Sequence, residues 1–158
     1  MDTAGYIERI DEQLRAYEFQ STDYTPVPDV YSRETNRLAS TGTHYEVVIV
    51  DHVDEPVVDE IEAELKTARD IYDGLSINST SRFDSERVYL LIVAEEVTKP
   101  MQIRAERAAG EVLNGDTFLL PVLVDLSGSR LLYDEPSTLK RVTTHGKMVS
   151  NVEKYFRL

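Results

Sequence analysis

The sequence predicts an α/β protein in which a mainly parallel sheet lies between two layers of helices. Three apolar runs carry this prediction, and we expect a strand at each of them: residues 44–53, 88–97 and 117–126. The intervening segments contain apolar residues at helical spacing, which is the pattern of consecutive βαβ units. We therefore expect a three-layer domain spanning residues 1–158, with three core strands, an antiparallel edge strand and about four helices.

The chain begins with a predicted amphipathic helix over residues 4–17. Its apolar side chains recur every three or four residues: Tyr6, Ile10, Leu14 and Tyr17. Residues 19–43 then follow no helical period and contain Pro26 and Pro28. Three interpretations are open for this irregular segment: it wraps around the domain, it contains a short strand, or it becomes ordered on a partner.

The middle of the chain contains the first two predicted crossovers. After the strand at 44–53, Asp54 is the expected N-cap of a helix that ends at Gly74. A polar loop over residues 75–86 leads to the second strand, and Thr98 is the expected cap of the next helix.

The third strand leads into a tight turn. Ser127-Gly128-Ser129 connects it to residues 130–133, which we expect to form an antiparallel hairpin at the edge of the sheet. A last helix is expected to begin after Ser137 and to extend to Phe156, with a break near His145 where a glycine interrupts the pattern.

The composition indicates a soluble protein adapted to salt. The chain has 29 acidic and 17 basic residues, a formal net charge of −12 and no cysteine. Concentrated salt shortens the Debye length to about 3 Å, which removes the repulsion that such a charge causes in dilute buffer. An ordinary acidic protein is the alternative interpretation. The missing cysteines exclude disulfides and thiolate metal sites, and the negative charge disfavours general nucleic-acid binding.

No apolar run approaches the roughly 20 residues that cross a bilayer, so we expect no membrane association. The first five residues contain neither the basic nor the apolar part of a secretory signal. The expected location is therefore the cytoplasm.

A carboxylate follows the apolar run of each predicted core strand, and these carboxylates are the main candidates for a functional site. Asp51, Glu95 and Asp125 lie where parallel strands bring their carboxyl ends together, and open α/β sheets bind ligands at such ends. Converging carboxylates suit Mg²⁺, so these three residues are candidate metal ligands and candidate catalytic residues of a phosphodiesterase or nuclease. Lys99 is a candidate for stabilising negative charge nearby.

Structural roles provide an alternative for the same residues. Carboxylates after strands often cap helices or brace loops, so Asp51 could stabilise the following loop and Asp125 the turn at Ser127. The only Glu-x-Lys sequence, at residues 64–66, falls inside a predicted helix with both charges outward, which does not support a nuclease site. His52 is flanked by acidic residues, but its neighbours in an extended chain point to the opposite face.

The favoured function is therefore a non-enzymatic binding or regulatory module that needs no cofactor. It is expected to act through contacts with a protein partner or, as a homodimer, with a second copy of the chain. Aromatic residues near both ends of the chain either pack the terminal helices or form an association surface. The last helix is basic within an acidic protein, through Lys140, Arg141, Lys147, Lys154 and Arg157.

Overall fold

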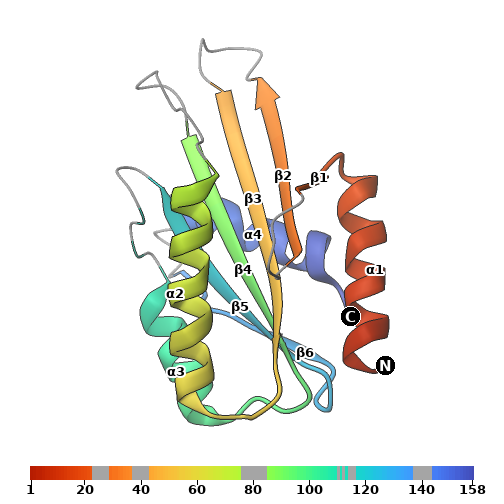
Figure 1. Cartoon of the computed structure of the whole chain (residues 1–158), viewed down its shortest axis with the longest axis vertical. Coiled ribbons are helices and arrows are strands. Elements are labelled where there is room, and N and C mark those ends of the chain that lie inside the picture. The colour runs from red at the N-terminus through yellow and green to blue at the C-terminus, as the bar shows by residue number, and fades with distance from the viewer. Residues whose placement is uncertain are drawn as a thin grey trace.

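The computed structural model describes residues 1–22, 29–36, 43–75, 85–109, 111, 113, 117–136 and 144–158. Over these residues the chain forms four helices and one six-stranded mixed sheet with strand order β1-β2-β3-β4-β5-β6 (Figure 1). The strands are β1 (Gln20–Thr22), β2 (Asp29–Asn36), β3 (Thr43–Val53), β4 (Ser85–Ala94), β5 (Phe118–Asp125) and β6 (Arg130–Leu132).

The sheet is parallel only at its centre. The pairs β3–β4 and β4–β5 are parallel, whereas β1–β2, β2–β3 and β5–β6 are antiparallel. The α/β class, the four helices and the three parallel core strands are confirmed, and so is the antiparallel strand after the Ser127 turn. The expectation of a mainly parallel sheet holds only in part, because β1 and β2 add an antiparallel flank beside β3.

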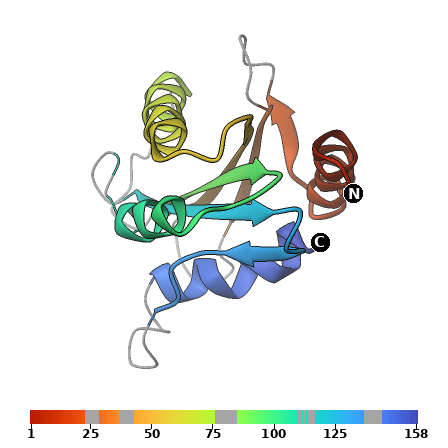
Figure 2. The same ribbon diagram turned by 90° about the horizontal axis from the view of Figure 1, so that it is seen from below.

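Two helices cover each face of this sheet (Figure 2). The helices α2 (Val58–Gly74) and α3 (Lys99–Ala108) pack on one face, and α1 (Thr3–Ala16) and α4 (Thr144–Phe156) pack on the other. Two apolar clusters, one on each face, share the strands between them, because alternate side chains of a strand point to opposite sides. Within the described chain, no helix is long and apolar enough to cross a membrane.

The strands β1 and β2 lie within residues 19–43. Of the three interpretations of this segment, the one in which it contains a strand is therefore confirmed for the described residues. Val30 is buried against the α2/α3 side, and its neighbour Tyr31 is buried against the α1/α4 side. The Tyr31 hydroxyl donates to Asp11 of α1 over 2.9 Å. Two adjacent apolar residues are too few to establish a period of two, which is why the sequence did not reveal this strand.

The beginning of α2 differs from the expectation. Val57 occupies the N-cap position with extended dihedral angles (φ −122°, ψ 152°), and no side chain of the described residues forms a capping hydrogen bond there. Asp54, the expected cap, lies three residues earlier, with 93% of its side chain exposed. A turn in which the Val57 amide donates to the Glu55 carbonyl separates Asp54 from the helix. The end at Gly74 and the beginning of α3 after Thr98 are confirmed.

The aromatic residues near the two ends of the chain pack into the core, as one of the two interpretations predicted. The hydroxyl of buried Tyr6 donates to the Phe156 carbonyl over 2.7 Å and so joins α1 to the end of α4. Tyr155 contacts the rings of Tyr17, Phe19 and Tyr89 edge to face. The expected cap at Ser137, the lysine and arginine at 140 and 141, and most of the polar loop before β4 lie outside the described residues.

Candidate binding site at the carboxyl ends of β3 and β4

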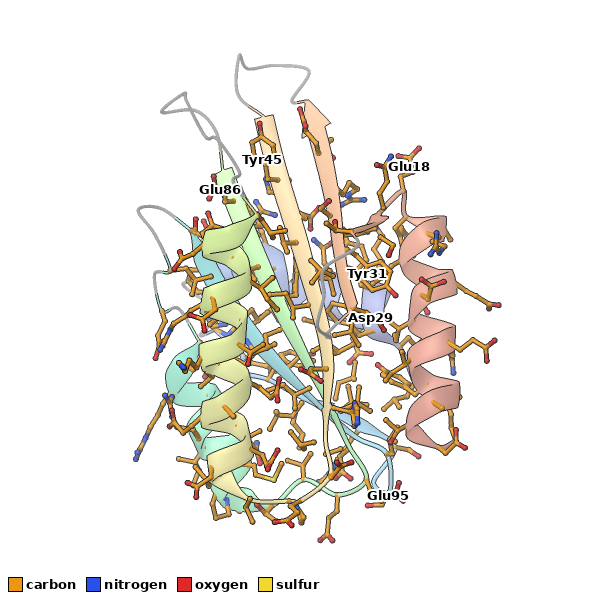
Figure 3. The ribbon with its side chains drawn as sticks, in the orientation of Figure 1. Glu18, Asp29, Tyr31, Tyr45, Glu86 and Glu95 are labelled. Carbon is orange, nitrogen blue, oxygen red and sulfur yellow. The ribbon has the colours of Figure 1, made fainter. Side chains whose placement is uncertain are left out.

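The three core strands end on one side of the sheet, as the parallel order requires. Glu95 directly follows the last residue of β4 and lies at this end, whereas Tyr45 and Glu86 lie at the other end of the sheet (Figure 3). Asp125 is level with Ala94 in the pairing register, whereas Asp51 pairs with Ile92, two residues further inside the sheet. The predicted acidic residues therefore share an end of the sheet but are not level with one another.

Asp125 is committed to the turn between β5 and β6. Its side chain is 3% exposed and accepts hydrogen bonds from the Gly128 amide (3.0 Å), the Ser127 hydroxyl (3.1 Å) and the Arg130 guanidinium (2.8 Å). Burial alone raises the pKa of Asp125, but the hydrogen bonds from these residues and the charge of Arg130 outweigh it, so the pKa lies below its ordinary value. The carboxylate therefore has the structural role of bracing the turn.

The turn also depends on a close approach at Gly128. A Cβ atom at this position would lie 2.6 Å from the Asp125 Oδ2 atom and 2.9 Å from the Arg130 Nε atom. Cβ atoms essentially never come within 3.0 Å of an atom to which they are not linked, so a side chain at 128 would displace the carboxylate or the guanidinium. Gly128 thereby keeps Asp125 and Arg130 in contact.

Asp51 faces the carboxyl group of Glu64, which was predicted to lie on the outer face of a helix. Glu64 of α2 is half-buried beside Asp51, and its Oε2 atom is buried with no hydrogen-bond partner among the described residues. Burial, the neighbouring Asp51 carboxyl and, less strongly, the Glu60 charge raise the pKa of Glu64 to about 8. Glu64 consequently holds a proton near neutral pH, which allows the two carboxyl groups to lie together.

A signal for this position of Glu64 was present in the sequence. It lies three residues after Ile61 and four before Ala68, both of which are buried against the sheet. These spacings place Glu64 at the border of the apolar face of the helix, where a long side chain reaches the core. The outward orientation predicted for Glu64 was wrong, whereas Lys66 is exposed as expected.

The other two residues singled out in the sequence, Lys99 and His52, have exposed side chains. Lys99 is exposed at the first position of α3, where its ammonium donates to the Gln102 side chain over 3.1 Å. His52 is 46% exposed, with its Nε2 atom 3.8 Å from an oxygen of Asp54. Across the described residues, no group of three or more histidine, aspartate or glutamate side chains is placed to hold a metal ion. The structure therefore does not gather Asp51, Glu95 and Asp125 around one ion.

The carboxyl ends of β3 and β4 instead border a depression of about 230 Å³. We call it the rim depression; its lining residues are Val53, Asp54, Pro56, Ala94, Glu95 and Glu96. Val53 and Ala94 are buried and provide an apolar floor, whereas the three carboxylates are exposed. Neither Asp51 nor Asp125 lines it.

Backbone hydrogen bonds attach the wall of the rim depression to the turn between β5 and β6. The Leu126 amide donates to the Ala94 carbonyl over 3.1 Å, and the Ser127 amide donates to the Glu95 carbonyl over 2.9 Å. The backbone of Glu95 is thus held by the same turn that Asp125 braces, while no hydrogen bond or ion pair to another described residue involves the Glu95 or Glu96 carboxylate. These two side chains are available to a ligand.

No family model, no curated protein and no solved structure matches this chain. Its function must therefore be inferred from the chemistry of its own surface.

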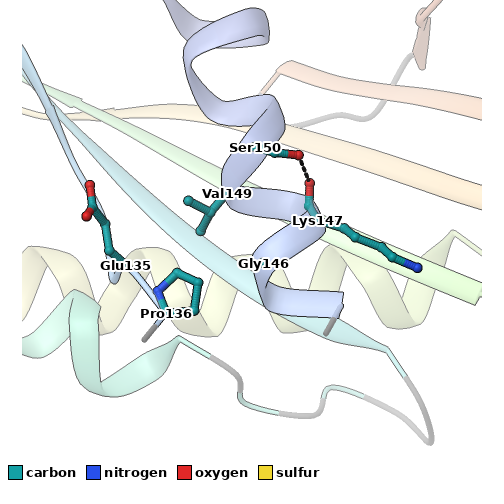
Figure 4. Close-up of a pocket in the computed structure, with 6 residues that line it drawn as sticks. All are labelled: Glu135, Pro136, Gly146, Lys147, Val149 and Ser150. Atoms are coloured by element: carbon teal, nitrogen blue, oxygen red, sulfur yellow. Dashed lines mark hydrogen bonds between the residues drawn. The ribbon is translucent and has the colours of Figure 1, made fainter. Parts of the chain in front are cut away.

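A second depression, of about 390 Å³, lies between the segment after β6 and α4 (Figure 4). Its walls are formed by Glu135 and Pro136 on one side and by α4 on the other, where the Ser150 hydroxyl donates to the Lys147 carbonyl. Among its described lining residues, the charged groups are the carboxylate of Glu135 and the ammonium of Lys147. Nothing in the sequence indicated it, because its walls come from segments without a motif.

Proposed function

We propose that this protein is a non-enzymatic binding module that acts through protein contacts, and that the rim depression is its contact site. The observation that carries the proposal is the combination of a buried apolar floor with the exposed carboxylates of Glu95 and Glu96, for which the described residues provide no hydrogen-bond or ion-pair partner. The partner is another protein or a second copy of this chain.

The chemistry of the rim depression suits a lysine or arginine side chain of the partner. The aliphatic part of such a side chain would cover Val53 and Ala94, and its charged end would reach Glu95 or Glu96. A charge-assisted hydrogen bond to a carboxylate is stronger than a neutral one, and arginine can bind in a bidentate manner. Val57, 42% exposed directly after the lining residue Pro56, adds apolar surface for the rest of the partner.

The placement of the other carboxylates supports a binding role over catalysis. A phosphodiesterase, the alternative function, needs carboxylates that are free to hold Mg²⁺. Asp125 already accepts three hydrogen bonds, and Asp51 accepts the His52 amide (2.8 Å) and faces protonated Glu64. This alternative consequently has less support than protein binding.

The proposal is tested by titrating the protein with the peptide acetyl-Arg-Leu-Arg-amide and following the backbone amide resonances by NMR. We expect saturable shifts that are concentrated at Val53, Ala94 and Glu95, and no such shifts with acetyl-Gln-Leu-Gln-amide. Because exposed charges contribute, the affinity should fall as salt is added.

The matched variants are E95Q/E96Q, at the rim depression, and E8Q/E12Q, which removes the same charge from the exposed side of α1. The rim variant should lose the concentrated shifts, and the α1 variant should keep them. Equal losses in both variants, or shifts scattered over the whole surface of the unmodified protein, would show that the peptide responds only to net charge, and the proposal would fail.

A Mg²⁺ titration followed by thermal unfolding separates the alternative function from this one. A cation site formed by the acidic residues would raise the melting temperature of the unmodified protein and leave D51A/D125A unchanged. That result would favour the phosphodiesterase. We expect equal responses of the two proteins to Mg²⁺, with a lower starting stability of the variant because the turn loses its brace.

A further inference from the structure

No further inference is drawn: the strongest candidate, the facing carboxyl groups of Asp51 and Glu64 between β3 and α2, is an acidic pair for which no second observation in the structure points to a ligand.

Discussion

Replacing Glu64 by glutamine should change how the stability of this protein depends on pH. The raised pKa of Glu64, about 8 against an ordinary value of 4.5, means that the folded protein retains a proton that the unfolded chain loses. Between these two pH values the folded state binds more protons, so the free energy of unfolding falls as the pH rises. E64Q is neutral at every pH and can donate an amide hydrogen to Asp51. It should therefore lack this decline.

The size of the effect follows from the burial of Glu64. A pKa change from 4.5 to about 8 would correspond to at most roughly 5 kcal/mol, at about 1.4 kcal/mol per pH unit. The side chain is only half-buried, and solvent screening reduces such electrostatic contributions severalfold. We therefore expect E64Q to match the unmodified protein near pH 4.5 and to be more stable by about 1–2 kcal/mol at pH 9.

Urea unfolding at a series of pH values between 4.5 and 9, at constant salt, measures this difference. E62Q is the matched control, because Glu62 is an exposed residue of the same helix that forms an ion pair with Arg104. The Arg104 hydrogen bond lowers the pKa of Glu62, so any effect of E62Q on stability should have the opposite sign above about pH 5. A stability difference between E64Q and the unmodified protein that stays constant over the whole range would refute the reasoning.

Three further substitutions test other contacts, each by urea unfolding. D125A removes the acceptor of three hydrogen bonds in the β5–β6 turn and should lower the free energy of unfolding by about 2–3 kcal/mol near pH 7. The loss should be smaller below pH 4, where the carboxyl group is protonated in the unfolded state. An unchanged unfolding midpoint would contradict the bracing role of Asp125. Y155F removes the hydroxyl that accepts a hydrogen bond from Arg33 (2.6 Å) and lies 3.4 Å from both carboxylate oxygens of buried Glu46. It should lower the free energy of unfolding by about 1–2 kcal/mol. An unchanged free energy would show that the remaining contacts satisfy Glu46. D2A removes the side chain that caps α1 by accepting from the Gly5 amide (2.8 Å) and should cost about 0.5–1 kcal/mol, whereas D2N should retain most of the stability.

The core strands and helices of this fold could be predicted because their apolar residues form continuous runs or recur at a regular spacing. The strand β3 contains four consecutive apolar residues, at 47–50, that are all buried, as expected for a strand covered on both faces. The helix α1 buries Tyr6, Ile10 and Leu14, which share one face. Each of these patterns arises because buried positions take apolar residues, so it can be read from the sequence alone.

The antiparallel flank and the site were harder to predict, because they depend on contacts between distant residues. The strand β2 has only Val30 and Tyr31 in its buried part, and its length is set by pairing with β3. Asp125 ends β5 and Glu95 directly follows β4, as predicted, but Asp51 lies two residues before the end of β3. The relative register of the strands cannot be read from the sequence. A shift of two residues between Asp51 and Asp125, together with the turn that binds Asp125, separates carboxylates that the sequence pattern placed together.

The outermost strands, β1 and β6, are each only three residues long. A short border strand offers few free backbone groups to a foreign chain, so it is a poor template for adding further strands in a growing fibril. Proline at position 121 withholds one more amide in β5, beyond the stretch that β6 pairs. At the borders formed by β1 and β6, the addition of foreign strands should therefore be limited even in concentrated salt, where the mutual repulsion of the acidic molecules no longer keeps them apart. The part of β2 beyond Ser32, which β1 does not pair, lacks this protection within the described sheet.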